Sequence, residues 1–430
     1  MKVNVMNANA DRHPCFNHGS AGKYARIHLP VAPDCNIQCN YCNRKCDCVN
    51  ESRPGVTSAV LTPEEALRYL GRVKEKAPHL SVAGIAGPGD PFADPGRTLR
   101  TLELIHAAHP DLIFCLSTNG LGLYDHIDRL AALGVSHVTI TVNAVDPAIG
   151  ARIYGWVRHK KRVLRGVEAA QALLDEQLRC IPKLKAAGML VKINSILISG
   201  INETHIPEVA IKVKELGADI MNVIPVLITE DTAFADRMPP SSSLTEKVRA
   251  QVAEHITLMS HCRRCRADAV GLLGKDDPSL HAELDKVVGE RTWIVPGKPY
   301  VAVATHERLL INGHLGDAKE LHIFEKRSEG RYGCIGVRKM PDPGSGDNRW
   351  RAVAAILRDC SAVIVSDAGA KPEEILAEEG LLLVRASGLI DACLNAVYTG
   401  QDLKRLEPAH ARQCGAGHGT CGGNGMGCCA

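Results

Sequence analysis

The stretch DCNIQCNYCNRKCDC, residues 34–48, carries three cysteines in the spacing C-x3-C-x2-C: Cys35, Cys39 and Cys42. Three thiolates at this spacing can hold three corners of a four-iron, four-sulfur (4Fe-4S) cube on one short loop. The fourth iron is then left without a protein ligand. An electron-transfer cluster normally takes four protein ligands, whereas a reactive cluster keeps one position free for substrate. The spacing therefore favours a reactive cluster over buried thiols or a zinc knuckle, because zinc sites prefer paired C-x2-C units.

This loop resembles the cluster loop of the radical S-adenosylmethionine (SAM) superfamily. In that superfamily an aromatic residue typically precedes the last cysteine, and Tyr41 occupies that position here. The resemblance implies that the amino and carboxylate groups of SAM chelate the open iron.

Charge and composition narrow the range of partners. The 430-residue chain has 51 Lys plus Arg against 48 Asp plus Glu, so neither nucleic acid nor a membrane is a favoured partner. The first fifteen residues lack an apolar signal core, and no apolar run approaches a membrane span. We therefore expect a cytoplasmic protein, in which thiols stay reduced and the 17 cysteines indicate metal rather than disulfides.

Six β-prone runs alternate with helical patterns in the first part of the chain. They cover residues 25–31, 80–86, 112–117, 137–142, 190–197 and 220–226. Strands that alternate with helices predict parallel pairing with right-handed crossovers. Six such units predict a partial (β/α)6 barrel, the fold that radical-SAM enzymes share, with functional loops after the strand C-termini.

Those loops carry candidate SAM ligands. The segment Gly87-Pro88-Gly89-Asp90 follows the second strand and resembles the glycine-rich segment whose backbone pairs with the SAM amino group. Because glycine lacks a side chain, this segment would let a ligand approach closely. Polar residues that could bind ribose and carboxylate, or merely cap a turn, are Ser117, Asn119, Asn143 and Asn194.

Two more sets of potential iron ligands lie outside the triplet. One set is Cys48, Cys262 and Cys265, and the other is His13, Cys15 and Cys115. The C-x2-C pair could instead be a zinc half-site, Cys115 could be a small core residue, and His13 could be a surface residue. Cys46 could replace Cys48.

Five segments closely resemble the NifB family, the radical-SAM proteins of nitrogenase cofactor biosynthesis. They are His13-Pro-Cys15, CNIQCNYCNR at 35–44, NESRPG at 50–55, AGIAGPGDP at 83–91 and LSTNG at 116–120. The resemblance implies that two 4Fe-4S clusters are fused and a carbide inserted, giving the eight-iron precursor (NifB-co, or L-cluster) of the nitrogenase cofactor. One SAM is expected to donate its methyl group to a cluster sulfide. A second SAM is expected to give the 5′-deoxyadenosyl radical that takes hydrogen from that methyl.

The same resemblance implies three 4Fe-4S clusters: one at the triplet, which binds SAM, and one substrate cluster at each further set. Glu51 and Arg53, on the loop beside Cys48, are candidates for proton transfer and charge neutralisation, or they form only a surface ion pair. The expected partners are an iron–sulfur cluster donor, nitrogenase cofactor carrier or scaffold proteins, and an electron donor. Two alternative functions stay open: a radical-SAM enzyme that acts on an organic substrate with auxiliary clusters, and a non-enzymatic iron–sulfur scaffold.

The predicted domains are the barrel at 1–270, a linker at 271–298, a small α/β domain at 299–405 and a flexible Cys/Gly-rich tail at 406–430. The small domain resembles the ribonuclease-H-like domain of the cofactor carriers NifX and NafY. Its His314 is a candidate cofactor contact, although Leu315 stands where that family more often has Phe, and the domain could serve only folding or docking. Cys334, Cys360 and Cys393 are predicted to be core residues. The tail cysteines with His418 could bind zinc, deliver iron or hold nothing.

Overall fold

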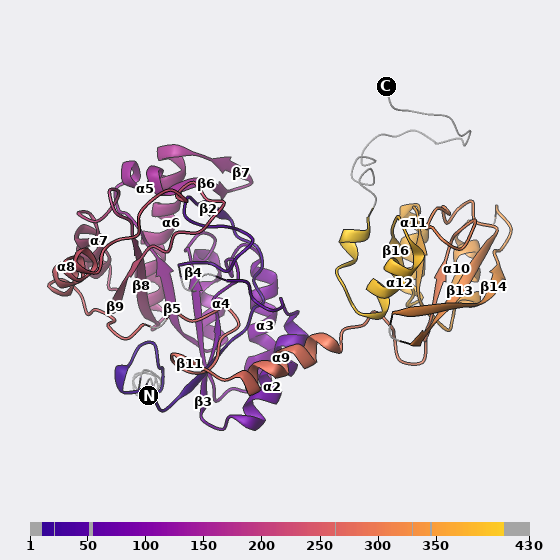
Figure 1. Ribbon diagram of the computed structural model, residues 1–430, viewed down its shortest axis with the longest axis horizontal. Coiled ribbons are helices and arrows are strands. Elements are labelled where there is room, and N and C mark those ends of the chain that lie inside the picture. Colours follow the sequence, from indigo (N-terminus) through magenta and orange to yellow (C-terminus); the bar gives the residue numbers. More distant parts are fainter. Residues whose placement is uncertain are drawn as a thin grey trace. The chain divides into compact units, whose positions relative to one another are not determined.

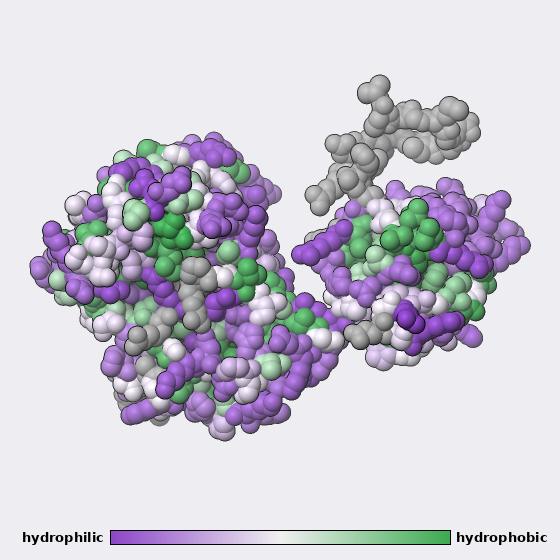
Figure 2. Space-filling view, viewed as in Figure 1, coloured by the Kyte–Doolittle hydropathy of each residue, from purple (hydrophilic) through white to green (hydrophobic). Residues whose placement is uncertain are grey.

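The computed structural model describes residues 11–20, 22–50, 55–262, 264–328, 330–344 and 346–407. Glu51, Arg53 and residues 408–430, including His418, lie outside the described residues. The chain divides into two compact units, residues 1–288 and residues 289–430 (Figure 1). The visible surface of each unit is mainly hydrophilic (Figure 2). None of the described helices is long and apolar enough to cross a membrane.

The first unit is built on an eight-stranded sheet in the order β11-β10-β1-β3-β4-β5-β8-β9. Its strands from β1 to β9 pair in parallel and in chain order, which confirms the predicted α/β alternation. Their bounds are β1 Ala25–His28, β3 Leu80–Ile85, β4 Ile113–Thr118, β5 Val135–Thr141, β8 Leu190–Leu197 and β9 Ile220–Pro225.

Helices connect these strands and bury their apolar faces against the sheet. They are α2 Pro63–Lys76, α3 Pro95–Ala108, α4 Ile127–Ala132, α5 Pro147–Ile153, α6 Gly166–Ala186, α7 Ile206–Glu215 and α8 Ser242–Ala253, with short 3-10 turns η1 His18–Ser20 and η2 Tyr124–His126. Helix α2 begins with a capping box. The Thr62 hydroxyl accepts the Glu65 N–H, and the Glu65 carboxylate accepts the Thr62 N–H.

A three-stranded antiparallel sheet, β2-β6-β7, was not predicted. Its strands are β2 Ile37–Cys39, β6 Tyr154–His159 and β7 Arg162–Leu164. Strand β2 lies inside the cysteine loop itself and pairs with β6. A three-residue strand is too short for a period-2 pattern to be visible in the sequence.

The predicted linker at 271–298 is wrong over most of its length. Strands β10 (Val270–Leu272) and β11 (Lys275–Asp276) extend the large sheet beyond β1, and helix α9 covers Pro278–Gly289. The polar composition of this segment concealed an amphipathic pattern. Leu280, Leu284 and Val287 are buried in the core of the first unit.

The second unit contains a five-stranded mixed sheet in the order β14-β13-β12-β15-β16. The strands are β12 Tyr300–Val303, β13 Glu320–Ser328, β14 Arg331–Lys339, β15 Cys360–Val365 and β16 Leu382–Arg385; the helices are α10 Asp347–Ile356, α11 Ala370–Glu378 and α12 Ile390–Tyr398, followed by η3 Leu403–Leu406. Strand β12 alternates between two cores: Val301 and Val303 pack on the α12 side, and Ala302 packs on the α10 and α11 side. Both faces of the sheet are therefore covered.

Candidate functional site

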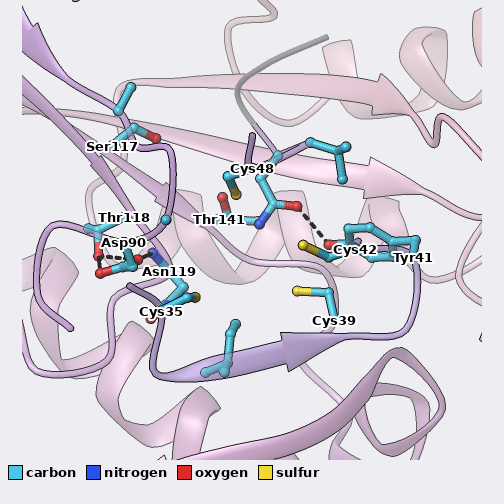
Figure 3. A pocket seen from close by; sticks show the side chains of 15 residues that line it. Cys35, Cys39, Tyr41, Cys42, Cys48, Asp90, Ser117, Thr118, Asn119 and Thr141 are labelled. Carbon is cyan, nitrogen blue, oxygen red and sulfur yellow. Dashed lines mark hydrogen bonds between the residues drawn. The ribbon is translucent and has the colours of Figure 1, made fainter. Parts of the chain in front are cut away.

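The three cysteines of the triplet line one pocket, which we call the triplet pocket. Figure 3 shows the sulfur atoms of Cys35, Cys39 and Cys42 directed toward the same space. The polar residues that share the pocket are Asn50, Asp90, Ser117, Thr118, Asn119 and Thr141. These polar residues come from the cysteine loop and from the C-terminal ends of β3, β4 and β5, as the barrel prediction required.

Burial controls the protonation of the three thiols. It raises the pKa of Cys35 to about 11, raises that of Cys39 well above its ordinary value, and raises that of Cys42. The metal-free thiols are therefore protonated at neutral pH, and iron binding must displace their protons. Three convergent thiols on one loop, one of them fully buried, fit a cluster that takes three protein ligands.

Tyr41 fixes the conformation of the cysteine loop. Its buried hydroxyl donates to Asn50 Oδ1 at 2.7 Å and accepts from Asn143 Nδ2 at 2.8 Å. The Asn143 side-chain oxygen also accepts the Ile196 N–H at 2.8 Å, so this predicted SAM ligand is already engaged. Asn194, another predicted SAM ligand, donates to the Asn50 carbonyl at 3.1 Å. Both asparagines thus hold the cysteine loop in place through hydrogen bonds to Tyr41 and Asn50.

Gly89 lines the triplet pocket and permits a close approach of two backbone segments. A Cβ placed on Gly89 would lie 2.0 Å from the Asp34 carbonyl oxygen. The Gly89 N–H donates to Ala32 O and the Asp90 N–H donates to Asp34 O, each at 2.6 Å. The glycine-rich segment is therefore clamped directly onto the residue that precedes Cys35.

Asp90 organises the polar wall of the triplet pocket. Its buried carboxylate accepts the Thr118 hydroxyl at 3.0 Å and the Asn119 N–H at 2.6 Å. Burial raises the pKa of Asp90 to about 6, against these hydrogen bonds. Asn119 in turn donates to Asn36 Oδ1 at 2.7 Å and lies 3.8 Å from the Cys35 sulfur. The predicted Asn119 is thus held beside the triplet.

A second pocket contains four cysteines and two histidines. These are Cys15, Cys115, Cys262, Cys265, His13 and His28. The structure therefore brings together both predicted sets except Cys48, which lines the triplet pocket instead. The Cys48 N–H donates to Pro88 O at 2.8 Å and holds this part of the loop there. Ala86 and Ser117 line both pockets, so the two share a wall.

Both histidines of the second pocket are neutral, and they differ in tautomer. His13 Nδ1 accepts the Cys15 N–H at 3.2 Å, so the proton of His13 is on Nε2. Burial lowers the pKa of His13 well below its ordinary value and that of His28 to about 4. His28 Nδ1 lies 2.9 Å from the Arg266 carbonyl oxygen, which can only accept, so the lone pair of His28 is on Nε2. The Nε2 atom of His13 is buried and has no hydrogen-bond partner among the described residues.

Comparison with known proteins identifies the family. Residues 29–213 match the model of the radical SAM superfamily, and residues 297–400 match that of the dinitrogenase iron-molybdenum cofactor family. The chain is 45% identical to the FeMo cofactor biosynthesis protein NifB of Chlorobaculum tepidum, over 98% of this chain and 100% of that protein. The chain belongs to the NifB family.

Other NifB proteins agree with this assignment. That of Bradyrhizobium diazoefficiens is 40% identical over 86% of this chain and 82% of its own length. That of Klebsiella pneumoniae is 38% identical over 86% of each. Membership of the radical SAM superfamily implies a 4Fe-4S cluster and SAM.

Several site residues of this NifB-family chain were missed in the sequence. Thr118 and Thr141 line the triplet pocket, and His28 and Lys192 line the second. Side chains alternate along a strand, so Lys192 lies on the same face of β8 as Asn194. The sequence could therefore have identified Lys192 as a site residue. His28 stands alone in a β-strand, and no spacing marks it.

The second unit of the NifB-family chain holds His314. Its side chain is 43% exposed, and its Nδ1 accepts the Gly316 N–H at 3.1 Å. Leu315, the departure from the more usual Phe, is fully buried, so it alters the core and leaves His314 accessible. Cys360 and Cys393 are core residues as predicted. Cys334 is only half-buried, because it lies on the edge strand β14.

Proposed function

We propose that this chain makes the eight-iron, carbide-containing precursor of the FeMo cofactor (NifB-co, or L-cluster). Its substrates would be two 4Fe-4S clusters, and SAM would supply the carbon. The observation that carries the proposal is the pair of sulfur-lined pockets with a common wall at Ala86 and Ser117. One pocket fits a resident SAM-binding cluster, and the other offers more iron ligands than one cluster needs.

In the triplet pocket, Cys35, Cys39 and Cys42 would hold the resident cluster. When bound, that cluster and SAM supply a 5′-deoxyadenosyl radical. Asp90 keeps the backbone of Asn119 in place, and the Asn119 amide faces the region beside Cys35. These residues orient SAM, and the buried walls of the pocket limit access by water.

In the second pocket, the four cysteines and two histidines would divide into two sets of three ligands for the substrate clusters. Each set then contains two thiolates and one imidazole, and His28 takes the role that the sequence assigned to Cys48. Each set leaves one iron open, where fusion can take place. The shared wall keeps the carbon donor in one pocket next to the clusters in the other.

The fold and the second unit support this assignment. The six parallel strands correspond to the partial (β/α)6 barrel of radical-SAM enzymes, and the second unit corresponds to a ribonuclease-H-like carrier domain in which His314 contacts the cofactor. The proposed partners are an iron–sulfur cluster donor, an electron donor and a cofactor carrier or scaffold protein. The proposed compartment is the cytoplasm.

The test is an anaerobic assay of the reconstituted full chain with SAM and dithionite. We would quantify 5′-deoxyadenosine and S-adenosylhomocysteine together, in the parent and in a Cys15→Ala/Cys262→Ala double variant. Cys180→Ala is the matched control, because Cys180 is buried in the first unit on α6 and lines neither pocket. The parent and control should form both products without any organic substrate.

The double variant should lose coupled product formation and the iron of the substrate clusters, and it should keep the spectroscopic signature of the SAM cluster. Turnover that depends on an added small molecule would favour an enzyme with an organic substrate. Iron binding without SAM cleavage would favour a scaffold. Either result would overturn the proposal.

A further inference from the structure

A buried arginine lies behind the second pocket and contacts one of its cysteines. Arg26, on β1, is 1% exposed. One of its Nη2 hydrogens is directed at the Cys265 sulfur, 3.1 Å away. The same nitrogen lies 2.7 Å from Asp276 Oδ1. Arg26 therefore joins the wall of the second pocket to an acidic residue on β11.

The remaining contacts of Arg26 make this geometry rigid. Its Nη1 donates to the backbone carbonyls of Gly271 and Leu272, at 2.7 and 3.1 Å. The planar guanidinium is thus fixed on one side by the β10–β11 turn, and its other edge faces Cys265. A planar donor that is held in this way loses little side-chain entropy when its sulfur partner binds iron.

The purely structural alternative is that Arg26 only anchors the turn on β1. That role explains the two carbonyls and Asp276, and it leaves the sulfur contact as an accident of packing. Two features argue against it. A guanidinium is always charged, so its burial is costly without anionic partners, and the Asp276 side chain is itself 31% exposed. The second pocket collects thiols whose iron-bound forms are anionic.

We propose that Arg26 is a positioning residue for the substrate cluster that Cys265 binds. Its N–H···S hydrogen bond and its positive charge stabilise the reduced, more negative cluster. This inference rests on the proposed function, because it needs Cys265 as an iron ligand. The physical basis is that hydrogen bonds to cluster sulfurs and net charge set cluster reduction potentials. No proton or bond is exchanged in this role.

The test measures a potential rather than an activity. In a Cys35→Ala/Cys39→Ala/Cys42→Ala background, which lacks the SAM cluster, we would reconstitute the full chain and titrate the remaining clusters by electron paramagnetic resonance. Arg26→Met removes the donors and the charge at similar volume, and Arg26→Lys restores the charge. The matched control is Arg249→Met.

Arg249 is a suitable control because its guanidinium also holds a backbone carbonyl of the large sheet, Val223 O, at 2.8 Å. It donates to no cysteine among the described contacts. Arg26→Met should shift one midpoint potential to a more negative value, Arg26→Lys should recover part of the shift, and Arg249→Met should leave the potentials unchanged. Thermal unfolding of each metal-free variant identifies any loss of folding.

Two results separate this inference from the proposed function. If Cys265→Ala keeps every substrate-cluster signal, the ligand assignment itself is wrong. If Cys265→Ala loses a signal but a folded Arg26→Met variant keeps the parent potentials, the inference about Arg26 alone is overturned. If Arg26→Met does not fold, the folded Arg26→Lys variant decides: its single ammonium cannot reproduce the planar contact, so an unchanged potential refutes the proposal.

Discussion

Replacing Gly89 by alanine should destabilise the first unit and displace the cysteine loop. The added Cβ would lie 2.0 Å from Asp34 O, 2.5 Å from Asp34 C and 2.9 Å from Pro33 O. Since real Cβ atoms stay at least 3.0 Å from such neighbours, the two backbones must separate by about 1 Å (3.0 − 2.0). All three atoms belong to backbone, so no side-chain rotation can relieve the contact.

The magnitude follows from two effects. Overpacking of this kind costs about 1–3 kcal/mol. The separation also weakens the hydrogen bonds from Gly89 to Ala32 and from Asp90 to Asp34. Each bond is worth about 1 kcal/mol, and the loss of about half of each adds about 1 kcal/mol. The sum is about 2–4 kcal/mol, which corresponds to a fall in the melting temperature of roughly 5–15 °C. Because Asp34 adjoins Cys35, reconstituted iron should fall as well.

The assay is anaerobic thermal unfolding of the metal-free full chain, together with iron per chain after reconstitution. Gly71→Ala is the matched control. Gly71 lies in α2, and a Cβ added there would have no atom within 4 Å, so alanine should stabilise by about 0.5–1 kcal/mol. If Gly89→Ala has the melting temperature of the parent and binds as much iron per chain, the contact between the glycine-rich segment and Asp34 is not what fixes the cysteine loop.

Three other changes test separate features. Tyr41→Phe leaves two buried amides without their hydroxyl partner, so urea unfolding should show a loss of about 1–3 kcal/mol, and an unchanged midpoint would refute this. Thr62→Ala removes the capping box of α2 and should cost about 1 kcal/mol in the same assay; no loss would mean that Glu65 alone caps the helix. Burial lowers the pKa of His322, so the unfolded chain takes up a proton first as the pH falls below about 6.5. The second unit should therefore lose stability between pH 7.5 and 5.5, and His322→Gln should flatten that profile; a parent profile that is already flat contradicts the reasoning.

Features encoded locally could be predicted from the sequence. Strand β8 has the predicted bounds, because a run with Leu, Val or Ile at five of eight positions separates two strong helical patterns. The capping box of α2 is a four-residue signal that acts on its own neighbours. The β10–β11 pair and α9 were not predicted, because their polar composition resembles that of a linker. Their stability comes from pairing with β1 and from packing on the core of the first unit.

The sequence predicts which residues are candidate ligands better than it predicts which of them share a pocket. Spacing identified the triplet and the C-x2-C pair, but the pocket that a cysteine enters depends on contacts between distant segments. Cys48 is placed by the hydrogen bond of its N–H to Pro88, forty residues away. His28 becomes a candidate only because the Arg266 carbonyl fixes its tautomer, and that contact spans most of the first unit.

The mixed donor set of the second pocket bears on how a product can leave it. A four-thiolate shell that releases its cluster must take up four protons, because a buried thiolate without metal is unfavourable. Under the proposed function, two thiolates and one imidazole hold each substrate cluster. Release of each cluster therefore requires two protons for the thiolates, and the imidazole is neutral both before and after release. The iron–histidine bonds are then the ones that break at least cost, and the iron–cysteine bonds retain a cluster until fusion. Replacing His28 by cysteine should therefore slow transfer of product from the reconstituted chain to an added carrier protein without reducing the iron that the chain binds. Transfer at the parent rate would show that ligand charge does not control release.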